Sequence, residues 1–123
     1  MRRALAVILF LFEPILAAGL LLRVGPTLFD RDALTVVAFA ARVVLALSSM
    51  AAAIGLRDSR PWAGRLALIV LIASAAFAVF QYFTRALPTS LAPDVAALAT
   101  GIIVLHHGTW VAILGILDRK TGD

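Results

Sequence analysis

Four long apolar runs, separated by short polar breaks, constrain this chain more than any other feature of its sequence. A helix needs about 20 apolar residues to cross the roughly 30 Å hydrocarbon core of a bilayer, and each run supplies about that length. No run alternates apolar and polar residues with the period of a strand, so helices are the spanning structure that satisfies the backbone. The four runs cover residues 4–22, 33–56, 62–83 and 94–117.

The composition agrees with a bilayer environment. The 123 residues are 63% hydrophobic, with a mean hydropathy of +1.03, whereas an ordinary soluble domain is about 45–50% apolar. We therefore predict an all-α fold, an integral membrane bundle of four transmembrane helices that forms a single domain over residues 1–123. Because the connections are short, helices adjacent in sequence are expected to pack antiparallel.

The breaks between the runs contain residues that end or begin helices. Residues 24–27, which include a Gly-Pro pair, are expected to end the first helix, and Asp30 or Asp32 to cap the second. Ser59 is expected to be the N-cap of the third helix, just ahead of a proline in the first turn. Residues 88–93, bounded by prolines, separate the third helix from the fourth.

Basic residues divide unequally between the two ends of the predicted bundle. Seven lie at the end that holds both termini and three at the other, so both termini are expected in the cytoplasm and the chain in the inner (plasma) membrane of the cell. The first run could alternatively be a cleaved signal peptide, but Glu13 interrupts it and Leu16 is too large for cleavage after Ala18. The two sets are Arg2, Arg3, Arg57, Arg60, Arg65, Arg119 and Lys120, and Arg23, Arg31 and Arg85.

Two charged residues lie deep inside the apolar runs. Glu13 and Arg42 each lie nine residues from opposite edges of the hydrocarbon core, about 14 Å at 1.5 Å per residue, so we expect them at one depth. A full charge in lipid is costly, and each residue is the obvious partner of the other. The same counting puts three more polar residues near this plane: Ser74, His106 and His107. The sequence thus predicts a polar layer to which every helix contributes.

The roles of these residues stay open at the level of sequence. The Glu13–Arg42 pair is interpreted either as a structural staple between helices or as a relay for protons or ions, or a substrate counter-ion. The histidines are expected to pack with a hydrogen bond or to handle protons. A third possibility is that His106 or His107 is the axial ligand of a haem or chlorophyll-type pigment. No His or carboxylate follows at i+3 or i+4, so we expect no metal site.

Small residues line one arc of the fourth run. Gly101, Gly108 and Gly115 are spaced by seven, and Ala112 falls on the same arc. Small side chains let helix backbones approach closely in lipid. This glycine seam is expected to pack either within the bundle or against another transmembrane chain, and the sequence does not separate the two.

No catalytic motif is visible. The sequence has no Ser/His/Asp arrangement with a plausible shared pocket, no HExxH and no Gly-rich phosphate loop. It has no cysteine, which excludes disulfides and thiol chemistry. The net charge of +4 comes from residues clustered between the apolar runs, a pattern that suits topology and anionic lipid rather than nucleic acid. We expect no enzymatic activity, no cofactor and no nucleic-acid partner.

The architecture is similar to that of the small multidrug resistance transporters, four-helix chains of comparable length with an essential membrane-embedded glutamate in the first helix. Glu13 stands where such a residue would, whereas Pro14 and Arg42 depart from that family's pattern. The likeness is one of shape. Our leading hypothesis is an accessory subunit or homo-oligomer that acts through helix contacts, with lipid and other transmembrane chains as partners. A small proton- or ion-coupled transporter is the second hypothesis, and a pigment- or haem-binding subunit is the third.

Overall fold

The computed structural model describes residues 2–85 and 92–120, and the side chains of residues 3–85 and 92–116. Most of the predicted break at 88–93, and the side chains of Arg2, Arg119 and Lys120, lie outside these ranges. Each of the four helices is long and apolar enough to cross a membrane. Their bounds agree with the predicted runs to within three residues. They are α1 (Arg2–Val24), α2 (Ala33–Arg57), α3 (Ala63–Thr84) and α4 (Pro93–Lys120), with a 3₁₀ segment, η1 (Gly25–Asp30), after α1.

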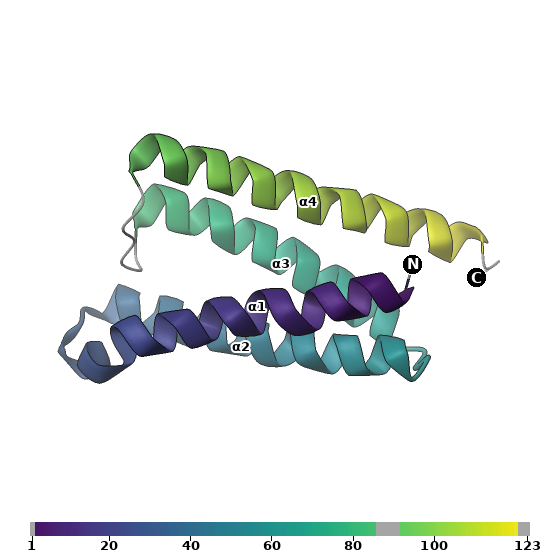
Figure 1. Cartoon of the computed structure of the whole chain (residues 1–123), viewed down its shortest axis with the longest axis horizontal. Helices are drawn as coiled ribbons and strands as arrows, with labels where there is room; N and C mark the ends of the chain where they lie inside the picture. Colours follow the sequence, from purple (N-terminus) through teal and green to yellow (C-terminus); the bar gives the residue numbers. More distant parts are fainter. Residues whose placement is uncertain (1, 86–91, 121–123) are drawn as a thin grey trace.

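The helices run up and down in sequence order (Figure 1), so the start of α1 and the end of α4 lie at the same end of the bundle. The main contacts join α1 to α2, α2 to α3, and α3 to α4. Helix α4 therefore lies at the edge of the bundle. A groove of about 520 Å³ separates it from α1, with walls that include Leu11 and Phe12 of α1 and Ile102 of α4. The bundle is open on this side.

The apolar interior forms two clusters, one toward each end of the bundle. The first lies at the end that holds both termini and includes Leu5, Leu9 and Leu71. The second lies toward the opposite end and includes Leu20 and Phe77. Along α1 and α3, the polar positions 13 and 74 fall between these clusters. A polar layer thus divides the apolar core.

The start of α2 is capped as predicted. The N–H of Thr35 donates to Oδ1 of Asp32 at 3.0 Å, which satisfies one of the donors that a helix N-terminus leaves unpaired. Hydrogen bonds from the side chain of Thr35 and from its main-chain N–H lower the pKa of the exposed Asp32 carboxyl, because they favour the charged form. The cap is therefore present at neutral pH and is lost as acid protonates the carboxylate.

The predicted N-cap at Ser59 is wrong, because Ser59 instead closes α2. Its φ of 55° places it in the left-handed region. The N–H of Arg60 donates to the carbonyl of Gly55 at 2.8 Å, and the N–H of Ser59 donates to that of Leu56 at 3.2 Å. This pair of bonds is a Schellman motif, which commonly ends a helix through one left-handed residue. Helix α3 begins after Trp62, without a side-chain cap.

This turn gives a first prediction. Ser59→Gly should raise the free energy of unfolding by about 1 kcal/mol, because an L-residue is disfavoured in the left-handed region and glycine is not. Ser59→Ala should give no such gain, since alanine keeps the Cβ atom. Denaturant unfolding in detergent micelles measures both variants. Equal stabilisation by alanine and glycine would contradict the assignment.

Candidate functional site

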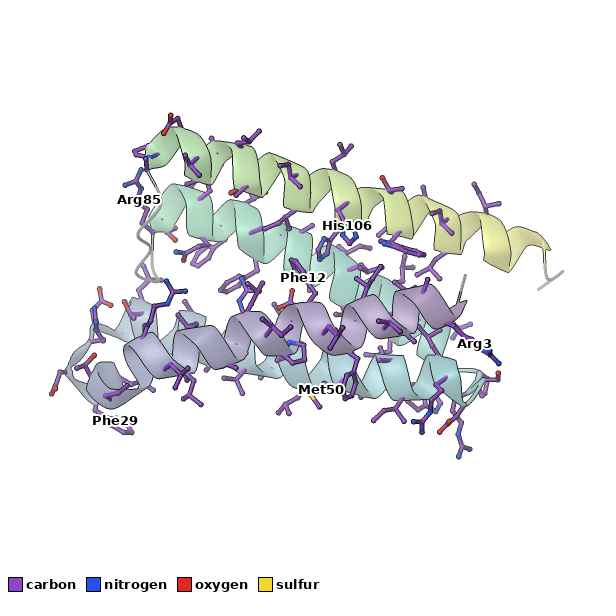
Figure 2. All side chains as sticks on the ribbon, viewed as in Figure 1. Arg3, Phe12, Phe29, Met50, Arg85 and His106 are labelled. Carbon is purple, nitrogen blue, oxygen red and sulfur yellow. The ribbon has the colours of Figure 1, made fainter. Side chains whose placement is uncertain are left out.

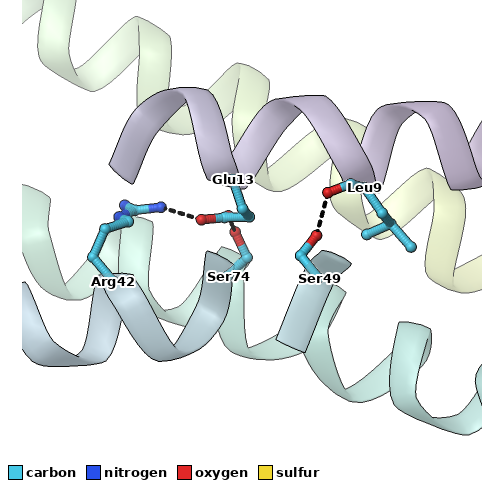
Figure 3. A network of polar contacts seen from close by, with 5 residues as sticks. All are labelled: Leu9, Glu13, Arg42, Ser49 and Ser74. Carbon is cyan, nitrogen blue, oxygen red and sulfur yellow. Dashed lines mark hydrogen bonds and ion pairs between the residues drawn. The ribbon is translucent and has the colours of Figure 1, made fainter. Parts of the chain in front are cut away.

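The two charges predicted to meet in the apolar interior form an ion pair. Nη1 of Arg42 lies 2.6 Å from Oε2 of Glu13 (Figure 3), although the residues are 29 positions apart. The side chain of Glu13 is 2% exposed and that of Arg42 is 12% exposed. A short charge-assisted hydrogen bond of this kind is among the stronger polar contacts in proteins. It offsets the cost of holding both charges away from water.

The second oxygen of the Glu13 carboxylate is also occupied. The hydroxyl of Ser74, on α3, donates to Oε1. The guanidinium of Arg42 lies over the ring of Phe77, with 4.5 Å between its central carbon and the ring centroid, a favourable cation–π geometry. One carboxylate from α1 is therefore held by α2 and α3 together.

A neighbouring hydrogen bond, which the sequence prediction did not assign, ties α1 to α2 again. The hydroxyl of Ser49 donates to the main-chain carbonyl of Leu9 at 2.5 Å, and Ser49 is fully buried. Leu9 lies one helical turn before Glu13. The signal for this contact was the position of Ser49, two turns beyond Arg42 on the same face of α2. We call these five residues the polar network: Leu9, Glu13, Arg42, Ser49 and Ser74.

His107 is buried, with 3% of its surface exposed. Its Nδ1 lies 2.9 Å from the carbonyl of Ile103. A carbonyl only accepts hydrogen bonds, so the hydrogen-bond partner assigns the proton of His107 to Nδ1. Its ring meets that of Phe12 edge-on, with centroids 5.2 Å apart. Helix α4 thus approaches α1 at this depth through a packed ring contact.

His106 has a different environment, on the groove between α1 and α4. Its Nε2 accepts from Nε1 of Trp110 at 3.2 Å, so a neutral His106 carries its proton on Nδ1. The two Nδ1 atoms, 3.4 Å apart, are then both donors and do not bond to each other. Among the described residues, neither histidine hydrogen-bonds to Glu13 or Arg42. The polar contacts of Glu13 therefore join α1 to α2 and α3.

The residues described do not assemble a metal site. Within residues 3–85 and 92–116, whose side chains are described, no group of three or more His, Asp or Glu residues lies close enough to hold an ion. Two of the nitrogens that could bind a haem or pigment are already used, since Nε2 of His106 accepts from Trp110 and Nδ1 of His107 bonds to Ile103.

The glycine seam of α4 faces outward. Gly101, Gly108, Ala112 and Gly115 are all exposed. A Cβ atom placed on any of the three glycines would meet nothing within 4 Å. The first alternative, packing within the bundle, is therefore wrong for the single chain. The inward face of α4 is instead the one with His107 and Leu114, which are both buried.

A groove runs beside the seam, between α3 and α4. It has a volume of about 500 Å³ and is lined by Val79 and Phe83 from α3 and by Ala97, Gly101 and Leu105 from α4. Ala97 is exposed, one turn before Gly101. Ala97 and Gly101 therefore line a shallow, largely apolar recess on the outer surface, at one end of the seam.

No family model, no curated protein and no solved structure matches this chain. Its function is therefore inferred from its own residues.

Proposed function

We propose that this protein is an integral membrane subunit without enzymatic activity, which acts by assembling with a second copy of itself through α4. The observation that carries the proposal is the outward glycine seam. Three glycines and an alanine fall on the most exposed helix, and all four are exposed among the described residues.

Small residues on an outer face favour association in lipid. Lipid tails are as apolar as leucine, so helices associate in a membrane through close packing and hydrogen bonds. Glycine lets a second backbone approach and brings more atoms into contact. The groove of about 500 Å³ beside Gly101 provides a recess for the side chains of the partner helix. The seam and this groove together support a helix-docking surface.

A second copy is the partner that this surface fits best. Two identical small-residue faces are self-complementary about a two-fold axis. The excess of basic residues at the terminal end favours one orientation for every copy, so two α4 helices would lie parallel. A spacing of seven residues between Gly101, Gly108 and Gly115 matches the repeat of a left-handed helix pair.

The polar network fits a structural role, in which it fixes the positions of α1, α2 and α3. Both carboxylate oxygens of Glu13 have partners, and its side chain is 2% exposed. A proton-coupled carrier, the second hypothesis, requires that carboxylate to exchange its proton and substrate. Arg42 and Ser74 hold the two oxygens of that carboxylate, so neither oxygen is open to a substrate. The network instead suits a fixed scaffold that holds the assembly helix in place.

A second prediction tests the seam. Gly108→Leu should weaken self-association by about tenfold or more, which corresponds to about 1.4 kcal/mol, because a large side chain separates the two backbones. Native mass spectrometry of the detergent-solubilised protein reports the oligomer, and a dilution series gives its dissociation constant. Far-ultraviolet circular dichroism should show the same helix content in the variant.

Gly19→Leu is the matched control. Gly19 also lies within a long apolar helix, and a Cβ atom there meets nothing within 4 Å. It should leave the oligomer unchanged. A wild-type protein that is monomeric at every concentration would overturn the proposed self-assembly. An oligomer that survives Gly108→Leu would exclude the seam as its interface.

A further inference from the structure

A narrow cleft leads from one end of the bundle to the buried ion pair. It has a volume of about 140 Å³ and lies between α3 and α4, with Arg42 of α2 at its inner end. Arg85 also lines it and lies at the end of α3, at one end of the bundle (Figure 2). The lining runs from Ala78 to Arg85 on α3, seven residues or about 10 Å of helix. The cleft therefore spans the distance from the bundle end to the polar layer.

The lining of this cleft is basic. It holds two guanidinium groups, those of Arg42 and Arg85, and none of the described residues that line it is acidic. Gln81, Tyr82 and Thr100 add polar side chains. Among the described residues, the ion pairs are Glu13–Arg42 and Arg57–Asp58, so Arg85 has no carboxylate partner there.

The two members of the ion pair differ in exposure, and the more exposed one, Arg42, is the one that lines the cleft. The Arg42 side chain is 12% exposed and that of Glu13 only 2%. Glu13 does not line the cleft, so a molecule that reaches its inner end meets the cation of the pair. A cation in that position would be repelled by both arginines, whereas an anion would be attracted by both.

The described residues of the core at the opposite end of the bundle are closely packed. The apolar cluster there packs α1, α2 and α3 together, and its members Leu5, Ala52, Ala63 and Leu71 are at most 1% exposed. Among the grooves described above, the cleft between α3 and α4 is the one lined by a member of the ion pair. Since liquid water occupies about 30 Å³ per molecule, 140 Å³ holds about four or five waters. That is too small for a drug-sized organic molecule, whose pockets measure about 300–1,000 Å³.

We propose that this cleft is a water-filled vestibule that admits small inorganic anions, such as nitrate or chloride, from the α3–α4 end of the bundle to Arg42, and rejects cations. The site is separate from the outward seam of α4, so it does not depend on self-assembly.

The absence of cysteine from the chain makes a direct test possible. A single cysteine at Ala99, which lines the cleft, is exposed to two thiol reagents of similar size in phosphatidylcholine vesicles. One is the anionic sulfonatoethyl methanethiosulfonate and the other is its cationic trimethylammonium counterpart. Each rate is divided by the rate of the same reagent with a small free thiol. The anionic reagent should be favoured by about tenfold or more, and nitrate should slow its reaction.

Three matched variants sharpen the result. Arg85→Gln in the Ala99→Cys chain should bring the ratio of the two rates toward one. Arg23→Gln should not, because Arg23 is an exposed arginine at the same end that does not line the cleft. A cysteine at Leu98, 65% exposed on the outer face of α4, should react slowly with both reagents, because lipid surrounds it.

The outcomes decide the proposal. A cysteine at Ala99 that reacts no faster than one at Leu98 would show that the cleft is dry. Equal normalised rates for the two reagents would show that it has no charge preference. If anionic lipid slowed the reaction of the cysteine at Ala99 and nitrate did not, the cleft would be a site for a lipid headgroup. Any of these results overturns the proposal.

Discussion

Alanine at Glu13 or at Arg42 alone is expected to lower the free energy of unfolding by about 3–5 kcal/mol. Each single change leaves the opposite charge buried without its partner. Glu13→Ala also removes the acceptor of the Ser74 hydroxyl. The double variant should recover part of the loss, because removing both charges costs less than leaving one unpaired.

The measurement is a double-mutant cycle. Unfolding free energies of the wild type, the two single variants and the double variant are compared in one detergent, and the coupling energy is the departure from additivity. A second cycle on Arg57 and Asp58 is the control. That pair lies on the surface, with its side chains 72% and 41% exposed, so its coupling should be small. Strictly additive losses at Glu13 and Arg42 would contradict a net stabilising contact.

The second large effect is expected at Gly55, near the end of α2. A Cβ atom on Gly55 would lie 2.8 Å from Cβ of Ala63 and 2.8 Å from the ring of Trp62. Ala63 is fully buried and its Cβ cannot rotate away. Gly55→Ala should therefore lower the free energy of unfolding by about 1–3 kcal/mol through overpacking, and Gly55→Leu by more.

Gly64→Ala is the matched control for this prediction. It lies in the first turns of α3, and a Cβ atom there meets nothing within 4 Å. Alanine is the better helix former, so this change should stabilise the protein by up to about 1 kcal/mol. Thermal unfolding followed by circular dichroism gives the sign of each effect. If Gly55→Ala left the free energy of unfolding unchanged, the turn between α2 and α3 would have adjusted to the new Cβ atom without a loss of stability.

Much of the architecture could be predicted because a bilayer makes length and hydropathy decisive. The helix bounds follow from where apolar residues stop, and the Glu13–Arg42 contact follows from equal depth in antiparallel helices. Ser74 was placed by the same counting and bonds to Glu13. The buried stripe on α2, which includes Ala38 and Ser49, follows from the 3.6-residue period.

Other features depend on information that a single helix pattern does not hold. The seam on α4 defines an arc of small residues, but its direction depends on which face of α4 meets α3. Serine is a common N-cap residue, yet Ser59 has a left-handed φ and ends α2 instead of starting α3. The cleft requires Arg42, Arg85 and Ile103 from three helices at once. Spacing within one run does not reveal such a combination.

Because all four helices are long and apolar enough to cross a membrane, the contact between Glu13 and its partners also bears on how such a chain would enter a bilayer during synthesis. The ribosome makes Glu13 first, Arg42 29 residues later and Ser74 61 residues later. A first helix released alone would carry an unmatched carboxylate into hydrocarbon, at considerable cost. Leaving the insertion machinery together with the second helix removes that cost. The opening half of this chain is thus suited to enter as a hairpin, with its charges already neutralised before the remaining helices arrive.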